Sequence, residues 1–134
     1  QGFVRQLPTL LQVPTLRYVL PTAPSLGGMR SWFSGMPGVG GDGAARDSID
    51  YAQHLIRKEL AHGVEAKRLF LGGFSQGGSI AVKAALSFPD AALGGCVAAS
   101  TFLNFGSSGP VTIASANKRL QVLCCHGEAD GAVP

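Results

Sequence analysis

The chain has 134 residues, of which 46% are hydrophobic and 14% are charged, and its formal net charge is +3. This composition fits one globular domain and is too apolar for a disordered protein. Its basic residues are scattered pairs such as Lys67 and Arg68, a pattern that does not indicate nucleic-acid binding but is compatible with a transient contact with an anionic membrane surface. No apolar run reaches the roughly 18 residues that a membrane-spanning helix needs, and the sequence has no basic-then-apolar signal segment at its start.

The first third of the chain predicts one strand and a long loop. Residues 16–20 are rich in β-formers and predict a strand, which the two prolines of residues 21–24 end. Residues 25–43 are rich in Gly, Pro and Ser and predict a loop. Trp32 and Phe33 are its only bulky anchor, and the indole either lines a pocket or pins the loop to the body of the protein.

The remaining elements alternate between helix and strand. Apolar residues at steps of three and four predict a helix over residues 47–62, and residues 68–71 predict a strand. A second helix is predicted over residues 79–88. Residues 93–99 and 120–125 are apolar runs without alternation, which is typical of strands covered on both faces. This order predicts a single α/β domain over residues 1–134 with a parallel sheet, whose chemistry gathers at the carboxyl ends of the strands.

The three cysteines, Cys96, Cys124 and Cys125, fall within these predicted buried strands. Their odd number argues against a disulfide framework and favours a reducing, cytoplasmic setting. Cys124, Cys125 and His126 could suggest a metal site, but consecutive strand residues point to alternate faces and cannot converge on one ion. The sequence therefore predicts no metal and no cofactor.

A glycine-flanked serine lies where a predicted strand turns into a predicted helix. Residues 73–77 have the sequence Gly-Phe-Ser-Gln-Gly, which fits the pattern G-x-S-x-G of a nucleophilic serine on a sharp turn. Ser75 is then the candidate nucleophile, and the backbone N–H of Gln76 is a candidate oxyanion donor at a helix N-terminus. Two other motif matches in the sequence are weaker than this one. A near P-loop lacks its lysine, because Gly78 stands there, and the G-x-G-x-x-G match at residues 38–43 follows no strand.

A serine nucleophile needs a histidine and a carboxylate, and in folds of this type the order is serine, acid, histidine. Asp130 follows the last predicted strand and is the candidate acid, although an aspartate before a glycine also suits a turn. Glu128 is the alternative carboxylate. His54, His62 and His126 all precede Asp130, so we expect the general base to belong to sequence beyond Pro134.

Several motifs together resemble the phospholipase/carboxylesterase family, which includes acyl-protein thioesterases and lysophospholipases. They are Gly72 to Gly78, His126 to Pro134, Pro21 to Pro24 and Ser31 to Phe33, and the similarity extends from about Leu16 to Pro134. The resemblance implies an α/β-hydrolase fold with Ser75, Asp130 and the Gln76 N–H in the roles given above. It also implies an acyl-binding groove near Trp32 and the segment Thr101, Phe102 and Leu103.

The chain departs from the family pattern at several points. No early strand with its oxyanion loop precedes Leu16, and no Gly-His motif follows, so we expect a domain incomplete at both ends. Ser34 and Asn104 stand where the family usually has aspartate and proline.

The leading hypothesis is a serine hydrolase that cleaves carboxylic esters or thioesters of acyl chains through an acyl-enzyme on Ser75, with an acylated protein, lipid or ester as substrate. The 134 residues alone are expected to be nearly inactive. The alternative is a catalytically incomplete acyl-binding or interaction fragment.

Overall fold

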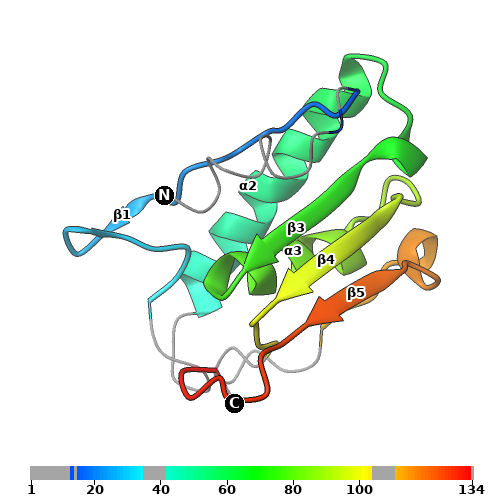
Figure 1. Cartoon of the computed structure of the whole chain (residues 1–134). Coiled ribbons are helices and arrows are strands. Elements are labelled where there is room, and N and C mark those ends of the chain that lie inside the picture. The colour runs from blue at the N-terminus through cyan, green and yellow to red at the C-terminus, as the bar shows by residue number, and fades with distance from the viewer. Residues whose placement is uncertain (1–12, 14, 35–41, 104–110, 134) are drawn as a thin grey trace.

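The computed structural model describes residue 13 and residues 15–34, 42–103 and 111–133. Its centre is a parallel three-stranded sheet with the strand order β3-β4-β5 (Figure 1). The strands are β3 (Phe70–Phe74), β4 (Gly95–Ala99) and β5 (Val122–Cys125). All three predicted strands of the second half are confirmed, with shifted bounds: β3 continues past Leu71 through two glycines and ends directly before Ser75.

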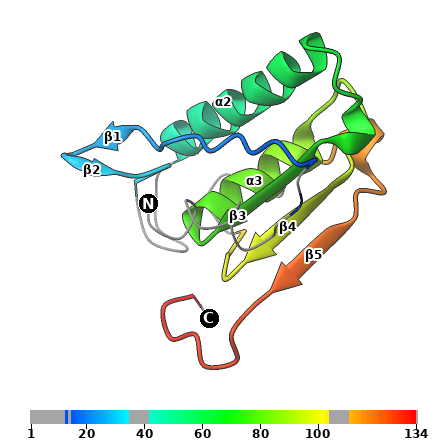
Figure 2. The same cartoon turned by 45° about the horizontal axis from the view of Figure 1, so that its top comes forward.

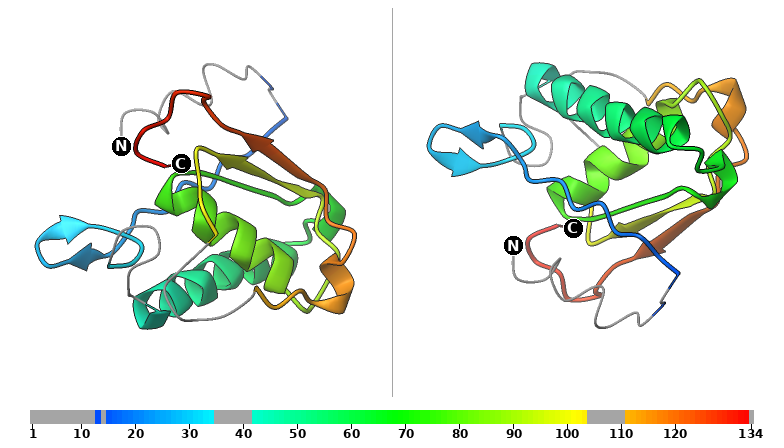
Figure 3. Two further views of the ribbon diagram at one scale, coloured as in Figure 1. Left: turned by 90° about the horizontal axis from the view of Figure 1, so that it is seen from below. Right: turned by 90° about the horizontal axis from the view of Figure 1, so that it is seen from above.

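Two helices cover one face of this sheet. The first, α2 (Asp42–Ala61), begins five residues before the predicted start, and α3 (Gln76–Ser87) begins directly after Ser75. Figure 3 shows α3 lying between the sheet and α2, so that α3 is the central layer. Every residue of α3 from Gly78 to Ala85 is buried, and most of these side chains are small or β-branched. Such side chains allow the helix to pack closely against its neighbours.

The main core lies between α3 and the sheet, with one side chain from α2. Its buried residues are Ile56, Ala81, Val82, Ala85, Phe88, Leu93, Cys96 and Ala98. Ile56 lies on the apolar stripe expected for α2, and Cys96 is buried as predicted. Burial raises the pKa of the Cys96 thiol to about 11, with a smaller contribution from the neighbouring Cys124.

The opposite face of the sheet is open in the part of the chain that the structure describes (Figure 2). Phe70, Phe74, Val97 and Leu123 expose 41% to 64% of their surface, and both cysteines of β5 are exposed. The prediction that residues 93–99 and 120–125 form strands covered on both faces is therefore wrong at Val97 and Leu123, and so is the predicted burial of Cys124 and Cys125. A continuous apolar run indicates that a strand is suited to burial on both faces, but the layer that covers it must come from other segments.

The predicted strand at residues 16–20 does not form, and this stretch is mostly exposed coil. A β-forming sequence becomes a strand only where a neighbouring strand completes its ladder, and no described strand pairs with it. A short antiparallel hairpin forms instead within the predicted loop, from β1 (Ser25–Leu26) and β2 (Met29–Arg30). Gly27 and Gly28 connect them with φ of 57° and 85°, the positive values that a two-residue hairpin turn demands.

Short connections tie the strands to the helical layer. The 3-10 turn η1 (Ala66–Arg68) precedes β3, and η2 (Ser115–Asn117) precedes β5. Asn117 is 1% exposed, accepts a hydrogen bond from Leu93 N and donates to the carbonyl oxygens of Phe88 and Ala91. The three hydrogen bonds of this side chain thus hold the segment between α3 and β4 in place beside η2. None of the described helices is long and apolar enough to cross a bilayer.

Candidate active site

Ser75 occupies a strained turn between β3 and α3. Its φ of 52° and ψ of −126° lie in a region that residues with a Cβ rarely adopt. The turn is held by the Ser75 N–H, which donates to the carbonyl of Ala99 at 3.0 Å. Gly73 makes it possible, because a Cβ at position 73 would lie 2.2 Å from the Gly77 carbonyl oxygen. Gly73 of the G-x-S-x-G pattern is therefore required by a close contact with the backbone of Gly77, whereas a Cβ on Gly77 would meet Trp32 Nε1 at an ordinary 3.5 Å.

Gln76 is the first residue of α3, so its backbone N–H lies among the unpaired donors of a helix N-terminus. Its side chain has a separate role that the sequence did not suggest. Gln76 Oε1 accepts hydrogen bonds from Ser31 Oγ at 2.9 Å and Trp32 N at 3.3 Å, and Nε2 donates to the Phe33 carbonyl at 3.3 Å. The amide thereby pins the Ser31 to Phe33 segment beside the Ser75 turn.

Trp32 and Phe102, which the family resemblance places beside an acyl-binding groove, lie in the segments that pack around α3 and its N-terminal turn. A Cβ on Gly77 would lie 3.5 Å from Trp32 Nε1, and Phe102 packs edge-on against Phe33 with ring centroids 6.1 Å apart. Leu103 is 43% exposed. A shallow hollow of about 390 Å³ adjoins Trp32, between the hairpin and α2; its lining residues are Thr22, Pro24, Leu26, Trp32, Asp47, Ser48 and Tyr51. Neither the hollow nor these placements assigns an acyl groove.

Thr101, which we expected to line that groove, directs its hydroxyl to the backbone. Thr101 Oγ1 donates to the Ser75 carbonyl at 2.7 Å and lies 3.0 Å from Ser79 Oγ. Asn104, the position in this segment that departs from the family pattern, lies outside the described residues.

Asp130 lies in the loop that follows β5. Its Oδ1 accepts hydrogen bonds from the N–H groups of Ala132 and Val133, both at 3.0 Å. These two bonds lower the pKa of the Asp130 carboxyl below its ordinary value, with smaller contributions from the Ser100 side chain and from His126, whose Nε2 lies 3.5 Å from Oδ2. The carboxylate is therefore well suited to stay ionised, which a triad acid needs.

Strand register brings Ser75 and Asp130 to the same edge of the sheet. Phe74 pairs with Ala99, and Ala99 pairs with Cys125, so all three strands end level and the segments after them adjoin. Neighbouring strands lie about 4.8 Å apart, which puts the ends of β3 and β5 roughly 10 Å from each other. A single imidazole placed above β4 could bridge such a gap.

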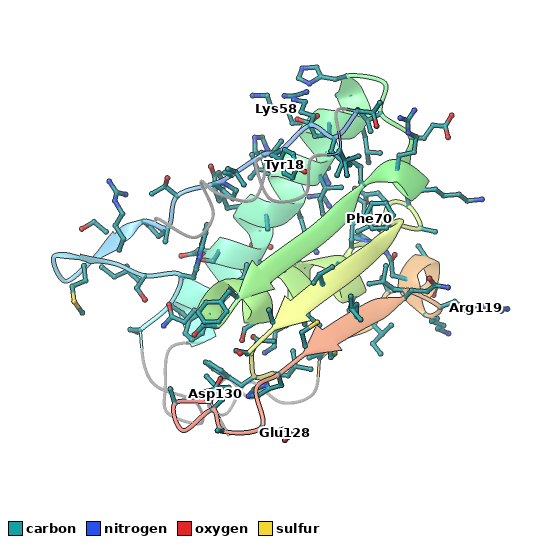
Figure 4. The ribbon with its side chains drawn as sticks, in the orientation of Figure 1. Tyr18, Lys58, Phe70, Arg119, Glu128 and Asp130 are labelled. Atoms are coloured by element: carbon teal, nitrogen blue, oxygen red, sulfur yellow. The ribbon has the colours of Figure 1, made fainter. Side chains whose placement is uncertain are left out.

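The three histidines do not take that place. His54 and His62 are exposed on and just after α2. The ring of His126 directs Nε2 to the Val133 carbonyl at 2.7 Å, and in the described part of the chain no histidine hydrogen-bonds to Ser75. Glu128 is exposed on the outer side of the loop that holds Asp130 (Figure 4), so the hydrogen bonds favour Asp130 over Glu128 as the acid. Among the described residues, no group of three or more His, Cys, Asp or Glu side chains could hold a metal ion.

A strained serine between a parallel strand and a helix, with an aspartate two strands away on the same edge, defines the class of α/β-hydrolases. The sequence matches the Phospholipase/Carboxylesterase family over residues 1–134, and the chain belongs to that family. The fold class inferred from the motifs is thereby confirmed.

The chain is similar to curated proteins of Oryza sativa subsp. japonica. It is 31% identical to a probable inactive carboxylesterase, over 95% of this chain and 57% of the relative, and 34% identical to a probable carboxylesterase, over 78% and 41%. A further probable carboxylesterase is 32% identical, over 91% and 57%. The chain thus spans roughly half the length of these relatives.

Crystal structures of Arabidopsis thaliana SOBER1 have the same fold. The TM-score is 0.73 at 23% identity for SOBER1 and 0.76 at 24% identity for one of its variants. Both alignments cover 92% of this chain and 67% of the other.

Proposed function

We propose that the full-length protein is a serine hydrolase that cleaves carboxylic esters or thioesters of acyl chains. The observation that carries the proposal is the backbone of Ser75, which has a φ of 52° between β3 and α3, where the backbone of Gly77 approaches Gly73 too closely for a Cβ at position 73. Strain of this kind persists where the surrounding structure maintains it, and it exposes a serine oxygen at the sheet edge. Membership of the Phospholipase/Carboxylesterase family supports the same class of reaction.

In this mechanism Ser75 Oγ attacks the acyl carbonyl carbon while a histidine accepts its proton. The Gln76 N–H donates to the oxyanion that forms, an interaction worth about 3 kcal/mol in comparable enzymes. Asp130 orients the histidine and stabilises its charged form. The alcohol or thiol then leaves with that proton, and water releases the acid from the acyl-enzyme. None of the chain's three histidines fits this role, so we propose that the imidazole comes from outside these 134 residues.

Covalent labelling tests the nucleophile. In the full-length protein, a fluorophosphonate probe should label the wild type and the matched control Ser115→Ala, whose serine is exposed in η2. The Ser75→Ala variant should lose both the label and ester turnover. Turnover by Ser75→Ala at the wild-type rate would refute the mechanism. Rates on an S-acylated peptide, a lysophospholipid and a short ester would identify the substrate.

The second candidate is an acyl-binding or interaction protein without turnover. Two observations favour it: no described histidine reaches Ser75, and one similar rice protein is named a probable inactive carboxylesterase. This function predicts that the full-length protein binds a fluorescent fatty acid but is not labelled by the fluorophosphonate. Labelling of Ser75 would exclude it.

A further inference from the structure

Two consecutive residues after β4 contact both candidate catalytic segments. β4 lies between β3 and β5, and Ser100 and Thr101 directly follow its last residue, Ala99. Ser100 has a φ of 39°, the left-handed value that residues with a Cβ rarely adopt. These two neighbours contact opposite sides: Thr101 contacts the turn that follows β3, and Ser100 contacts the end of β5.

Thr101 fixes the backbone of the Ser75 turn. Its hydroxyl donates to the Ser75 carbonyl at 2.7 Å, and the same carbonyl accepts the Ser79 N–H at 3.2 Å. Thr101 also rests on Gly78, because a Cβ there would lie 2.8 Å from Thr101 Cβ and Oγ1. Ser79, whose hydroxyl lies 3.0 Å from Thr101 Oγ1 and bonds the Phe102 carbonyl, is completely buried. The Thr101 hydroxyl therefore has one rigid position.

Ser100 holds the end of β5, the strand that leads into the Asp130 loop. Its N–H donates to the Cys125 carbonyl at 2.8 Å, which extends the β4–β5 pairing one residue past the end of β4. Its side chain is one of the groups that lower the pKa of the Asp130 carboxyl, which also accepts hydrogen bonds from two backbone N–H groups of its own loop. The Asp130 loop is thus held by its own backbone N–H groups, and Ser100 holds the end of β5 from which this loop starts.

We propose that Ser100 and Thr101 are positioning residues that together set the separation and orientation of Ser75 and Asp130. The inference rests on the proposed function, in which these two are nucleophile and acid. A backbone in a sparsely populated region keeps its conformation only when its surroundings over-determine it, and the Thr101 hydroxyl is one of the few donors that hold Ser75. A shift of about 1 Å in such a site costs about 100-fold in rate.

Isosteric variants of Thr101 separate the hydroxyl from packing. Thr101→Val removes the donor and keeps the volume, Thr101→Ser keeps the donor, and Thr112→Val is a matched control at an exposed threonine. In the full-length protein we expect Thr101→Val to lower the rate constant of fluorophosphonate labelling about tenfold or more. Thr101→Ser and Thr112→Val should stay within about twofold of the wild type. The ¹³C chemical shifts of Ser75, which report its backbone conformation, should move only in Thr101→Val.

The Ser100→Ala variant tests the effect of Ser100 on Asp130 without any enzymatic assay. Titration of the Asp130 carboxyl by ¹³C NMR should give a higher pKa in Ser100→Ala than in the wild type, because the Ser100 side chain, one of the groups that lower this pKa, is removed. His126, whose Nε2 lies 3.5 Å from Asp130 Oδ2, is present in both proteins and does not account for the difference.

The outcomes separate this inference from the proposed function. If the wild type is not labelled at Ser75, the proposed function fails, and the NMR results alone judge the positioning role. If the ¹³C chemical shifts of Ser75 are unchanged in Thr101→Val, Thr101 has no positioning role. If the pKa of Asp130 is unchanged in Ser100→Ala, Ser100 has no positioning role. A Thr101→Ser variant as slow as Thr101→Val would also contradict the inference.

Discussion

Gly73 and Gly72 are adjacent in β3, yet we expect opposite effects when each is replaced by alanine. A Cβ at position 73 would lie 2.2, 2.3 and 2.5 Å from the O and C atoms of Gly77 and the N atom of Gly78. All three are backbone atoms, so no side-chain rotation relieves the overlap. Real contacts of this type need more than 3 Å, and the first turn of α3 must therefore move away from β3 by roughly 1 Å.

Displacements of this kind in a packed interior cost about 1 to 3 kcal/mol and occasionally more. Since all three contacted atoms belong to the backbone, we expect the free energy of unfolding of Gly73→Ala to fall by about 3 kcal/mol. A Cβ at position 72 would instead meet Val97 Cβ at 3.6 Å, an ordinary van der Waals distance. Gly72→Ala should be neutral or more stable by up to about 1 kcal/mol, because alanine loses less backbone entropy on folding.

Urea unfolding followed by circular dichroism measures both variants against the wild type. The same preparations of the full-length protein, treated with a fluorophosphonate, should show slower labelling of Gly73→Ala by about 100-fold if α3 has moved by about 1 Å. A Gly73→Ala variant within about 0.5 kcal/mol of Gly72→Ala would refute the argument that the Ser75 turn depends on backbone contact between residues 73 and 77.

Three further predictions concern the buried Asn117 side chain, the three cysteines and the Asp130 carboxyl. Asn117→Ala should lower the free energy of unfolding by about 2 to 4 kcal/mol in urea unfolding, because three backbone groups lose a buried partner, whereas the exposed Lys118→Ala should change it by less than about 0.5 kcal/mol. A thiol reagent should modify the two exposed cysteines of β5 in the native protein and Cys96 only after denaturation, since Cys96 is buried with a pKa of about 11; rapid native modification of all three would contradict its burial. The lowered pKa of Asp130 means that its ionised form stabilises the fold above its ordinary pKa of 3.8, and that this contribution is lost as the pH falls through the lower folded-state value. Asp130→Asn should therefore be less stable than the wild type near pH 6, with a difference that narrows below about pH 4; a difference independent of pH would contradict the assignment.

The sequence predicted the elements around Ser75 more reliably than those at the front of the chain. Residues 70–99 form a strand, a helix and a strand in immediate succession, so their pattern and their hydrogen-bond partners lie within the same short stretch. Residues 16–20 have strand-forming side chains but no described neighbouring strand, and they stay coil. The early start of α2 at Asp42 shows the same dependence on context, because Ala45 is buried against Phe33 and Ile80.

The sequence by itself determined the family, the parallel order of helices and strands, and the candidate serine and acid, because glycine spacing and apolar periodicity record local backbone requirements. Only the tertiary structure decided which neighbours hold these residues. The contact of Thr101 with the Ser75 carbonyl joins residues 26 positions apart, and the Gln76 bonds to residues 31–33 join residues 43 to 45 positions apart. Hydroxyl and amide groups of this kind carry no periodic signal, and their roles arise from strand register and helix packing.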